Sequence, residues 1–320
     1  ALVIDLTNEK ERPRAIGVIW CMLTIGIIVG AIAISITTKG LDGVSDVALL
    51  EPALQKFMLW VGLIVLGISV LACWGIEPND LNLDSKVGQT NKEIGLKESW
   101  DLVTSSPQIL IFFTFLVLYT LGLFLQDPIL ESYGAEVFNM PISKTTLLNA
   151  FWGGGTLFGL LLGGLWITPR LGKLSTARVG CWMIIASLSL LILSGLNRNV
   201  NGLYGVLVIF GIAAGLATNS ALSLMLDLTL PAVAGTFVGV WGLAQALSRA
   251  MGKVFGGGLL DIGRSITGSE NTFYAFSFVF FLEIIVMILA IFVLNKVSIK
   301  RFKEETNAKI ETLMMAELDP

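Results

Sequence analysis

The chain has 320 residues, of which 54% are hydrophobic and 14% are charged, and its mean hydropathy is +0.80. Soluble domains carry about 25% charged residues, so this composition excludes an ordinary water-soluble domain and indicates an integral membrane protein surrounded by lipid. The formal net charge of -3 and the pI near 5.2 provide no basic surface of the kind that binds nucleic acid.

Histidine is absent from the sequence. Imidazole is the commonest protein ligand of zinc and the readiest general base near neutral pH, so zinc binding and histidine-based catalysis are disfavoured. Imidazole is also a usual axial ligand of chlorophyll magnesium, which disfavours a bulk light-harvesting antenna. Three cysteines lie in apolar runs without CxxC spacing, as free buried thiols do: Cys21, Cys73 and Cys181. No metal site is predicted.

Eight apolar stretches are long enough for a membrane-spanning helix of about 20 residues. In chain order they are 14–36, 57–76, 107–126, 146–167, 179–196, 203–226, 235–258 and 273–295. Because eight is even, both termini lie on one side of the membrane. That side carries fourteen of the Lys and Arg residues and the rest of the chain carries seven, so the positive-inside rule predicts cytoplasmic termini.

The longest polar connection divides the chain into two helical bundles. Residues 77–106 lack apolar periodicity, and we interpret them as a cytoplasmic linker. Residues 1–76 are then the remainder of an N-terminal six-helix bundle, 107–295 form a C-terminal six-helix bundle, and 296–320 form a cytoplasmic tail.

A short internal echo supports this division. Asp5-Leu6-Thr7 is followed by Gly17, and Asp227-Leu228-Thr229 by Gly239, with 12 residues from Asp to Gly both times. Each copy precedes a span on the predicted cytoplasmic side. A parallel duplication of six plus six spans, as in the major facilitator fold, fits this spacing. The chain then shows eight spans of a probable native twelve, and further spans are expected upstream because it begins without Met.

The segment from Gln126 to Gly134 places Asp127 and Glu131 at the mouth of an apolar span, where charge is costly unless it serves a function. One interpretation is a short capped helix, with Asp127 before Pro128 at its start and Gly134 at its end. A helix cap does not need the hydrogen-bonding groups of Gln126, Glu131 and Tyr133, which lie in the same segment. We therefore also predict a functional surface for a ligand or a partner protein that includes Gln126, Asp127, Glu131 and Tyr133.

Glycines recur every fourth residue in four places: Gly155 to Gly163, Gly211 with Gly215, Gly235 with Gly239, and Gly252 with Gly256. Such faces let helices approach closely in lipid. The alternative is a flat surface for a ligand, to which Trp152, Trp166 and Trp241 could contribute.

Charges within the last two spans predict an intramembrane pair. Arg249 and Lys253 lie one turn apart on the same helix face as Gln245. At a rise of about 1.5 Å per residue, Arg249 and Glu283 lie at matching depths, so we expect them to pair.

The sequence resembles the PucC/LhaA family, a branch of the major facilitator superfamily, over most of its length. The similar segments are Gln126-Asp127-Pro128-Ile129-Leu130-Glu131-Ser132-Tyr133-Gly134, Thr145 to Gly155, Asp5-Leu6-Thr7 with Arg12-Pro13-Arg14-Ala15, Leu226 to Thr229, Gly235-Thr236-Phe237 and Trp241 to Leu247.

The resemblance implies a multi-pass protein of a thylakoid or photosynthetic inner membrane. Such a protein supplies chlorophyll or bacteriochlorophyll, bound transiently, to light-harvesting or photosystem proteins during their assembly. Without histidine, the magnesium of such a pigment needs an oxygen ligand. The polar candidates in the spans are Asp127, Glu131, Asn149, Asn219 and Gln245.

Two other functions remain open. A secondary transporter of a small amphipathic solute is the alternative, but the loop from Leu165 to Lys173 has Pro169 where facilitators carry an aspartate. A chlorophyll-synthesising enzyme is disfavoured. The segment from Asn79 to Asp84 resembles an aspartate-rich pyrophosphate site, but Asp84 follows Asp80 by four residues instead of three.

Overall fold

The computed structural model describes residues 12–42, 44, 47–74, 107–228, 234–268 and 271–301, without the side chains of 12–20, 47–50, 73 and 234–237. Within these residues the chain forms helices and turns and no strand, so the predicted all-α class is confirmed. The predicted linker 77–106 and most of the tail lie outside the described residues. So do Asp5-Leu6-Thr7, Thr229 and the segment from Asn79 to Asp84.

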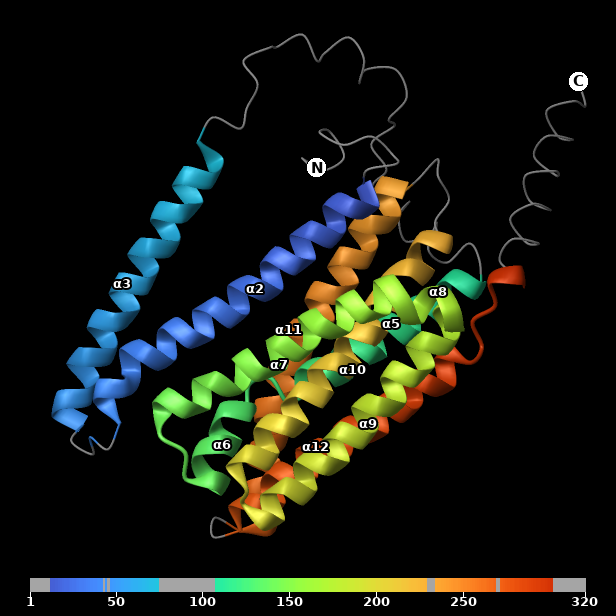
Figure 1. Ribbon diagram of the computed structural model, residues 1–320. Coiled ribbons are helices and arrows are strands. Elements are labelled where there is room, and N and C mark those ends of the chain that lie inside the picture. Colours follow the sequence, from blue (N-terminus) through green and yellow to red (C-terminus); the bar gives the residue numbers. More distant parts are fainter. Residues whose placement is uncertain are drawn as a thin grey trace, which may run out of the picture.

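Each predicted span contains a long helix (Figure 1). In chain order the elements are α2 (Arg12–Thr38), the 3₁₀ turn η1 (Lys39–Leu41), α3 (Val47–Cys73), α5 (Pro107–Leu125), α6 (Leu130–Phe138), α7 (Ile142–Leu162), the π turn η3 (Gly163–Ile167), α8 (Thr168–Leu171), α9 (Lys173–Asn197), α10 (Val200–Asp227), α11 (Ala234–Thr267) and α12 (Thr272–Leu294).

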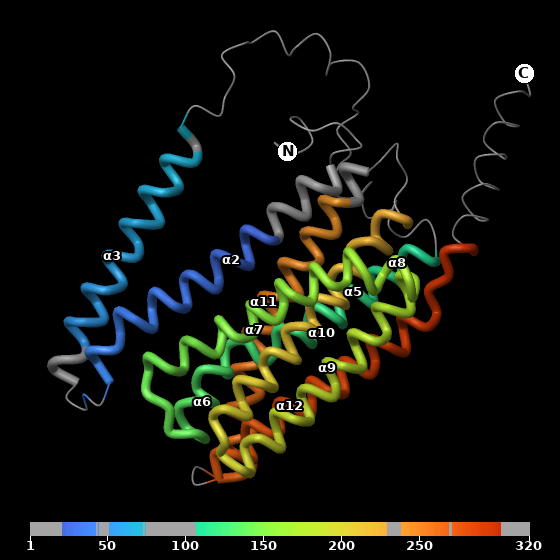
Figure 2. Tube along the Cα trace, viewed as in Figure 1, coloured from blue at the N-terminus to red at the C-terminus, as the bar shows by residue number. Residues whose placement is uncertain are grey.

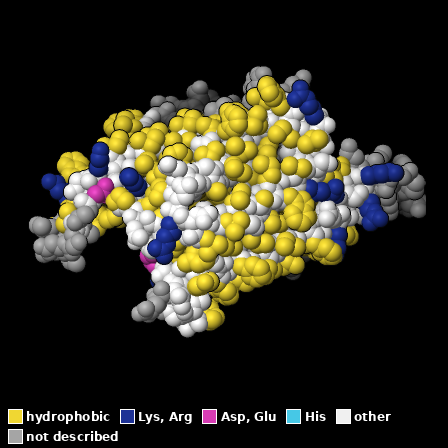
Figure 3. Space-filling model, turned by 60° about the horizontal axis from the view of Figure 1, so that its bottom comes forward, with side chains coloured by type: hydrophobic (Ala, Val, Ile, Leu, Met, Phe, Trp, Pro, Cys, Tyr) yellow, Lys and Arg dark blue, Asp and Glu magenta, His cyan; other side chains and the backbone are white. Residues whose placement is uncertain are grey.

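Seven segments of the described chain are long and apolar enough to cross a membrane, which supports a multi-pass integral membrane protein. The remaining predicted span, the seventh in chain order, is occupied by α11, which has 34 residues but carries Arg249 and Lys253 in its interior. Figure 3 shows one face of the molecule, where hydrophobic side chains cover the middle and Lys and Arg gather toward the ends. An apolar belt with charged ends is the surface that a bilayer requires.

Six long helices form a bundle in which α10 packs against α7 and α9, α5 against α11 and α12, and α12 against α9 and α11. Its core contains fully buried aromatic side chains, including Phe115, Phe210, Phe276 and Phe280. Outside this bundle, α2 lies along α7, and α3 stands apart at the edge (Figures 1 and 2). The apolar window of α3 has no residue buried inside the structure.

The contact between α7 and α10 is made by glycines. A Cβ on Gly155 would lie 2.3 Å from the carbonyl oxygen of Val208, and one on Gly211 would lie 2.1 Å from that of Trp152. Gly159 and Gly215 repeat the pattern one turn further along. These distances leave no room for a side chain, so the prediction that these glycines serve close helix packing is confirmed.

Two polar links fasten the ends of helices. After η1, the Asp42 carboxylate accepts hydrogen bonds from the Ser143 backbone N–H, at 3.1 Å, and from the Ser143 hydroxyl at the start of α7. At the other end of the bundle, Lys173 Nζ lies 2.7 Å from an Asp227 carboxylate oxygen, which joins the start of α9 to the end of α10.

Candidate functional site

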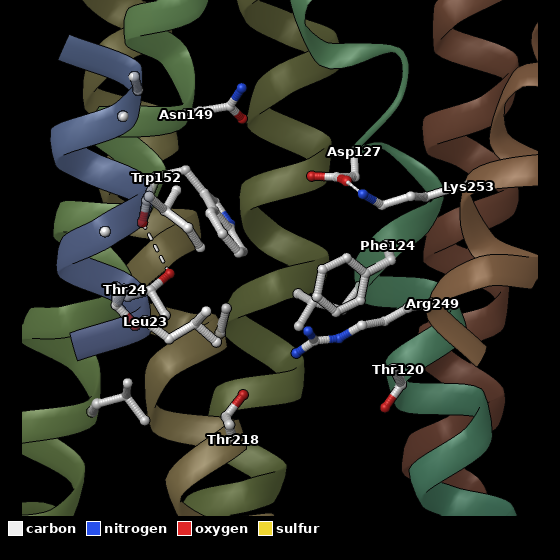
Figure 4. Close-up of a pocket in the computed structure, with 18 of the residues that line it drawn as sticks. Leu23, Thr24, Thr120, Phe124, Asp127, Asn149, Trp152, Thr218, Arg249 and Lys253 are labelled. Atoms are coloured by element: carbon white, nitrogen blue, oxygen red, sulfur yellow. Dashed lines mark hydrogen bonds and ion pairs between the residues drawn. The ribbon is translucent and has the colours of Figure 1, made fainter. Parts of the chain in front are cut away.

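A cavity of about 430 Å³ lies between α2 and the bundle helices α5, α7, α10 and α11 (Figure 4). This volume is within the range of about 300–1,000 Å³ that is usual for small-molecule sites. Most of the predicted site residues line it, namely Asp127, Glu131, Asn149, Trp152, Gln245 and Arg249. The structure therefore brings together residues separated by more than 100 positions in the sequence.

The α2 side of the cavity is apolar and partly formed by small residues. Leu23, Ile27 and Ala31 contribute side chains, whereas Gly26 and Gly30 contribute none. A Cβ added at either glycine would meet no atom within 4 Å. These two glycines leave open space, unlike the glycines between α7 and α10.

Asp127 lies in the turn between α5 and α6, with its carboxylate 2.9 Å from Lys253 Nζ on α11 (Figure 4). The expected role of Asp127 as a helix cap is wrong, because α6 begins at Leu130 and its preceding residue makes no side-chain cap. Gly134 does not end this helix either. It lies inside α6, where an added Cβ would be 2.8 Å from Leu148 Cδ1, and the helix ends at left-handed Asn139.

Glu131 lies in the first turn of α6 and is half-buried at the cavity. Its Oε1 accepts a hydrogen bond from Asn149 Nδ2 on α7, at 2.7 Å. This hydrogen bond fixes the orientation of the carboxyl group relative to α7. One carboxylate and one carboxamide, both among the predicted site residues, thus form a single polar unit.

Arg249 enters the cavity from α11 and lies over the Phe124 ring, with Cζ 4.5 Å from the ring centroid (Figure 4). The predicted pair with Glu283 is not formed. Glu283 is fully buried on α12, and neither of its carboxylate oxygens has a hydrogen-bond partner in the described structure. Matching depth along two helices does not make their side chains face each other.

Two predicted site residues lie away from the cavity. Tyr133 is fully buried, donates a hydrogen bond from its hydroxyl to the Leu191 carbonyl oxygen at 2.7 Å, and packs against the rings of Phe276 and Phe280. Gln126 is 2% exposed and does not line the cavity. Both side chains belong to the interior of the bundle.

Two donor groups at the cavity lack partners. Among the described residues, neither Trp152 Nε1 nor Thr120 Oγ1 has a hydrogen-bond partner, although both atoms are buried. Thr120 and Thr218 were not predicted as site residues, because short hydroxyl side chains are common in membrane helices. The apolar residues of α2 that line the cavity were also not predicted, because the sequence does not distinguish them from residues that face lipid.

The arrangement defines a class of protein: an all-helical, multi-pass membrane protein with an amphipathic cavity between its helices. The particular family follows from comparison with known proteins. The family model described as PUCC protein matches residues 1–302, so the chain belongs to this family. The resemblance to the PucC family stated from the sequence motifs is thereby confirmed.

Curated relatives come from photosynthetic bacteria. The chain is 26% identical over 281 residues to "Protein PucC" of Rhodovulum sulfidophilum, covering 87% of this chain and 60% of that protein. It is 29% identical over 305 residues to the "Bacteriochlorophyll synthase 44.5 kDa chain" of Rhodobacter capsulatus, covering 91% and 65%. It is 28% identical over 264 residues to "Protein PucC" of Cereibacter sphaeroides, covering 82% and 55%. The chain thus spans less than two thirds of each relative's length.

Proposed function

We propose that this protein binds a chlorophyll-type pigment transiently in the cavity between α2 and the bundle, and delivers it during assembly of photosynthetic pigment-protein complexes. The name of one relative refers to bacteriochlorophyll, which directs attention to this class of molecule. We assign no reaction to the chain: its role is to hold and hand over the pigment in a photosynthetic membrane. Its partners are light-harvesting or photosystem proteins.

The observation that supports the proposal best is the combination of an apolar wall with a few fixed polar groups. Leu23, Ile27 and Ala31 of α2 form an apolar part of the lining, and Glu131 of α6 and Arg249 of α11 add charged groups to it. A tetrapyrrole has an apolar ring face and tail together with a magnesium ion and carbonyl oxygens. Such a ligand needs apolar area for affinity and a small number of polar groups for orientation.

The packing of α2 gives the pigment a lateral path. α2 packs mainly against α7, while α11, which lines the cavity with α2, packs mainly against α5 and α12. Among the described residues, α2 and α11 therefore form no extensive contact with each other. A pigment with a long tail can extend between them toward lipid.

A matched pair of glycine substitutions tests the proposal. Gly30→Leu fills open space at the cavity wall, whereas Gly154→Leu adds the same side chain on α7 where it also meets no atom within 4 Å but does not line the cavity. The purified full chain is titrated with chlorophyll in detergent, and binding is followed by the shift of the pigment absorption band. We expect Gly30→Leu to weaken binding at least about tenfold and Gly154→Leu to leave it unchanged. Equal affinities for both variants would remove the cavity as the pigment site.

A second candidate is a secondary transporter of a small amphipathic solute, which the charges at the cavity favour. Asp127, Glu131, Arg249 and Lys253 all line it, and buried charge in membrane helices often marks a substrate or proton path. Flux of a fluorescent amphipathic solute into proteoliposomes, with and without a proton gradient, separates the two functions. Gradient-dependent uptake without pigment binding would favour the transporter.

Co-purification tests the proposed partners. Mild detergent extraction from a photosynthetic membrane should recover light-harvesting or photosystem subunits with the wild-type chain, and the absorption spectrum of the eluate should contain pigment. Protease accessibility of a tag after residue 320 tests the cytoplasmic placement of the termini. Recovery of the chain without any photosynthetic subunit would contradict the assembly role.

A further inference from the structure

We propose that Glu131 supplies the oxygen ligand to the magnesium of the bound pigment, and that Asn149 is a positioning residue that orients its carboxylate. This inference rests on the proposed function and names the contact by which the site recognises its pigment. Magnesium is a hard cation that prefers oxygen ligands, and this sequence offers oxygen-bearing side chains but no histidine.

The structure distinguishes Glu131 from the other oxygen-bearing candidates. The charge of the Asp127 carboxylate is compensated by Lys253 Nζ, 2.9 Å from Oδ2, whereas no ion pair to Glu131 is found among the described residues. Asn219 donates from Nδ2 to Thr168 Oγ1 at 3.2 Å and does not line the cavity. Gln245 lines the cavity but is a neutral amide, which is a weaker ligand for a divalent cation than a carboxylate.

The hydrogen bond between Glu131 and Asn149 leaves a ligand position. Asn149 Nδ2 occupies Oε1 at 2.7 Å, and no hydrogen bond to Oε2 is found among the described residues. Groups that ligate metals are commonly held in place by a hydrogen bond from a neighbouring side chain, and loss of that neighbour costs about 10- to 100-fold in affinity. Asn149 has this relation to Glu131.

The surroundings supply further contacts for a ring ligated at this point. Trp152 lies three residues after Asn149 on α7, hence on the same helix face, and its Nε1–H lacks a partner. Figure 4 shows Trp152 projecting from α7 toward the space that Phe124 and Arg249 approach from the opposite side. Thr120, which is 2% exposed, contributes a second unpartnered polar atom. These donors are suited to the carbonyl oxygens at the edge of a pigment ring.

A comparison of magnesium-containing and metal-free pigment tests the assignment. The full-length wild-type chain, Glu131→Gln and Asn149→Leu are titrated with chlorophyll and with its metal-free pheophytin, and affinity is measured by fluorescence quenching. We expect Glu131→Gln to weaken chlorophyll binding at least about tenfold and to leave pheophytin binding unchanged. Asn149→Leu should produce a smaller loss, again for chlorophyll alone, because it acts through Glu131.

Glu136→Gln provides the matched control, since Glu136 lies on the same helix but forms its ion pair with Arg264 away from the cavity. Glu131→Asp retains the carboxylate one methylene shorter, so it should recover part of the chlorophyll affinity and part of the magnesium coordination band in resonance Raman spectra. It also serves as the test variant if Glu131→Gln does not fold.

The outcomes separate the two proposals. A wild-type chain that binds neither pigment contradicts the proposed function itself. A wild-type chain that binds both pigments equally, or a Glu131→Gln variant that keeps full preference for chlorophyll, overturns the ligand assignment but leaves pigment binding intact.

Discussion

The helices α10 and α2, which both pack against α7, use glycine in different ways. Toward α10, Gly155 and Gly211 bring backbones so close that a single methyl group has no place. Toward α2, Gly26 and Gly30 border empty space, and the two helices enclose a cavity beside their contact. A glycine in a membrane helix therefore has no fixed meaning. The atoms across from it decide whether it closes a contact or leaves a hollow.

The largest effect on stability is expected at the contact between α7 and α10. Gly211→Ala should destabilise the bundle by about 3 kcal/mol or more, because its Cβ would collide with the Trp152 carbonyl oxygen and the Thr156 backbone nitrogen, which are not flexible side-chain ends. Thermal unfolding in detergent measures the change. Gly154→Ala is the control, and it should be neutral or stabilising because alanine favours helix over glycine. Equal melting temperatures for the two variants would contradict the close contact.

A stabilising change is expected at Glu283. Both of its buried carboxylate oxygens lack partners in the described structure, so Glu283→Leu should stabilise the chain by about 1–3 kcal/mol. Gln108 is the contrasting case, because its Oε1 accepts from the Ser298 backbone N–H at 2.7 Å. Gln108→Leu should destabilise the chain, since it leaves that donor unpaired. Destabilisation by Glu283→Leu would reveal a partner for this carboxyl group.

A smaller loss is expected at Tyr133. Tyr133→Phe removes the hydrogen bond to the Leu191 carbonyl oxygen and should cost about 1 kcal/mol of unfolding free energy. Pigment affinity should not change, because the residue packs in the core and not at the cavity. A selective loss of pigment binding with normal stability would return Tyr133 to the functional surface that the sequence predicted.

The smallest effect is expected at the rim of the bundle. Lys173→Met breaks the contact with Asp227, whose side chain is 32% exposed, and should cost about 0.2–1 kcal/mol. A double-mutant cycle with Asp227→Asn isolates the pair, and added salt should reduce the measured coupling. A coupling energy well above this range would show that the ion pair stabilises the packing of α9 on α10 more than an ordinary surface pair would.

The sequence predicted the helices well because the bilayer imposes a length and an apolar composition on each span. It also predicted close packing from the four-residue glycine spacing, which the structure confirms at Gly155 and Gly211 but not at Gly239, where an added Cβ would meet no atom within 4 Å. Its prediction of the Arg249 and Glu283 pair failed for a geometric reason. Hydropathy and residue counting give depth in the membrane, but they do not give the rotation of each helix about its axis.

The site was predicted in part. Polar residues in apolar spans pointed to Asp127, Glu131 and Asn149, which the structure brings to one cavity. The same segment could not present Tyr133 as well, because residues two apart on a helix face in different directions. The α2 wall could not be recognised, because apolar residues toward a cavity and toward lipid have the same composition.

The hydrogen bonds between Asp42 and Ser143 restrict how α2 can move relative to α7. They fasten the end of α2 that leads through η1 to the start of α7, by contacts from both carboxylate oxygens. A displacement of α2 relative to α7 that preserves these contacts pivots about that end. The gap gained then grows with distance from Asp42, so the cavity would widen most toward the opposite end of the helix. A molecule leaving by that route would pass between the helices near the membrane face opposite Asp42.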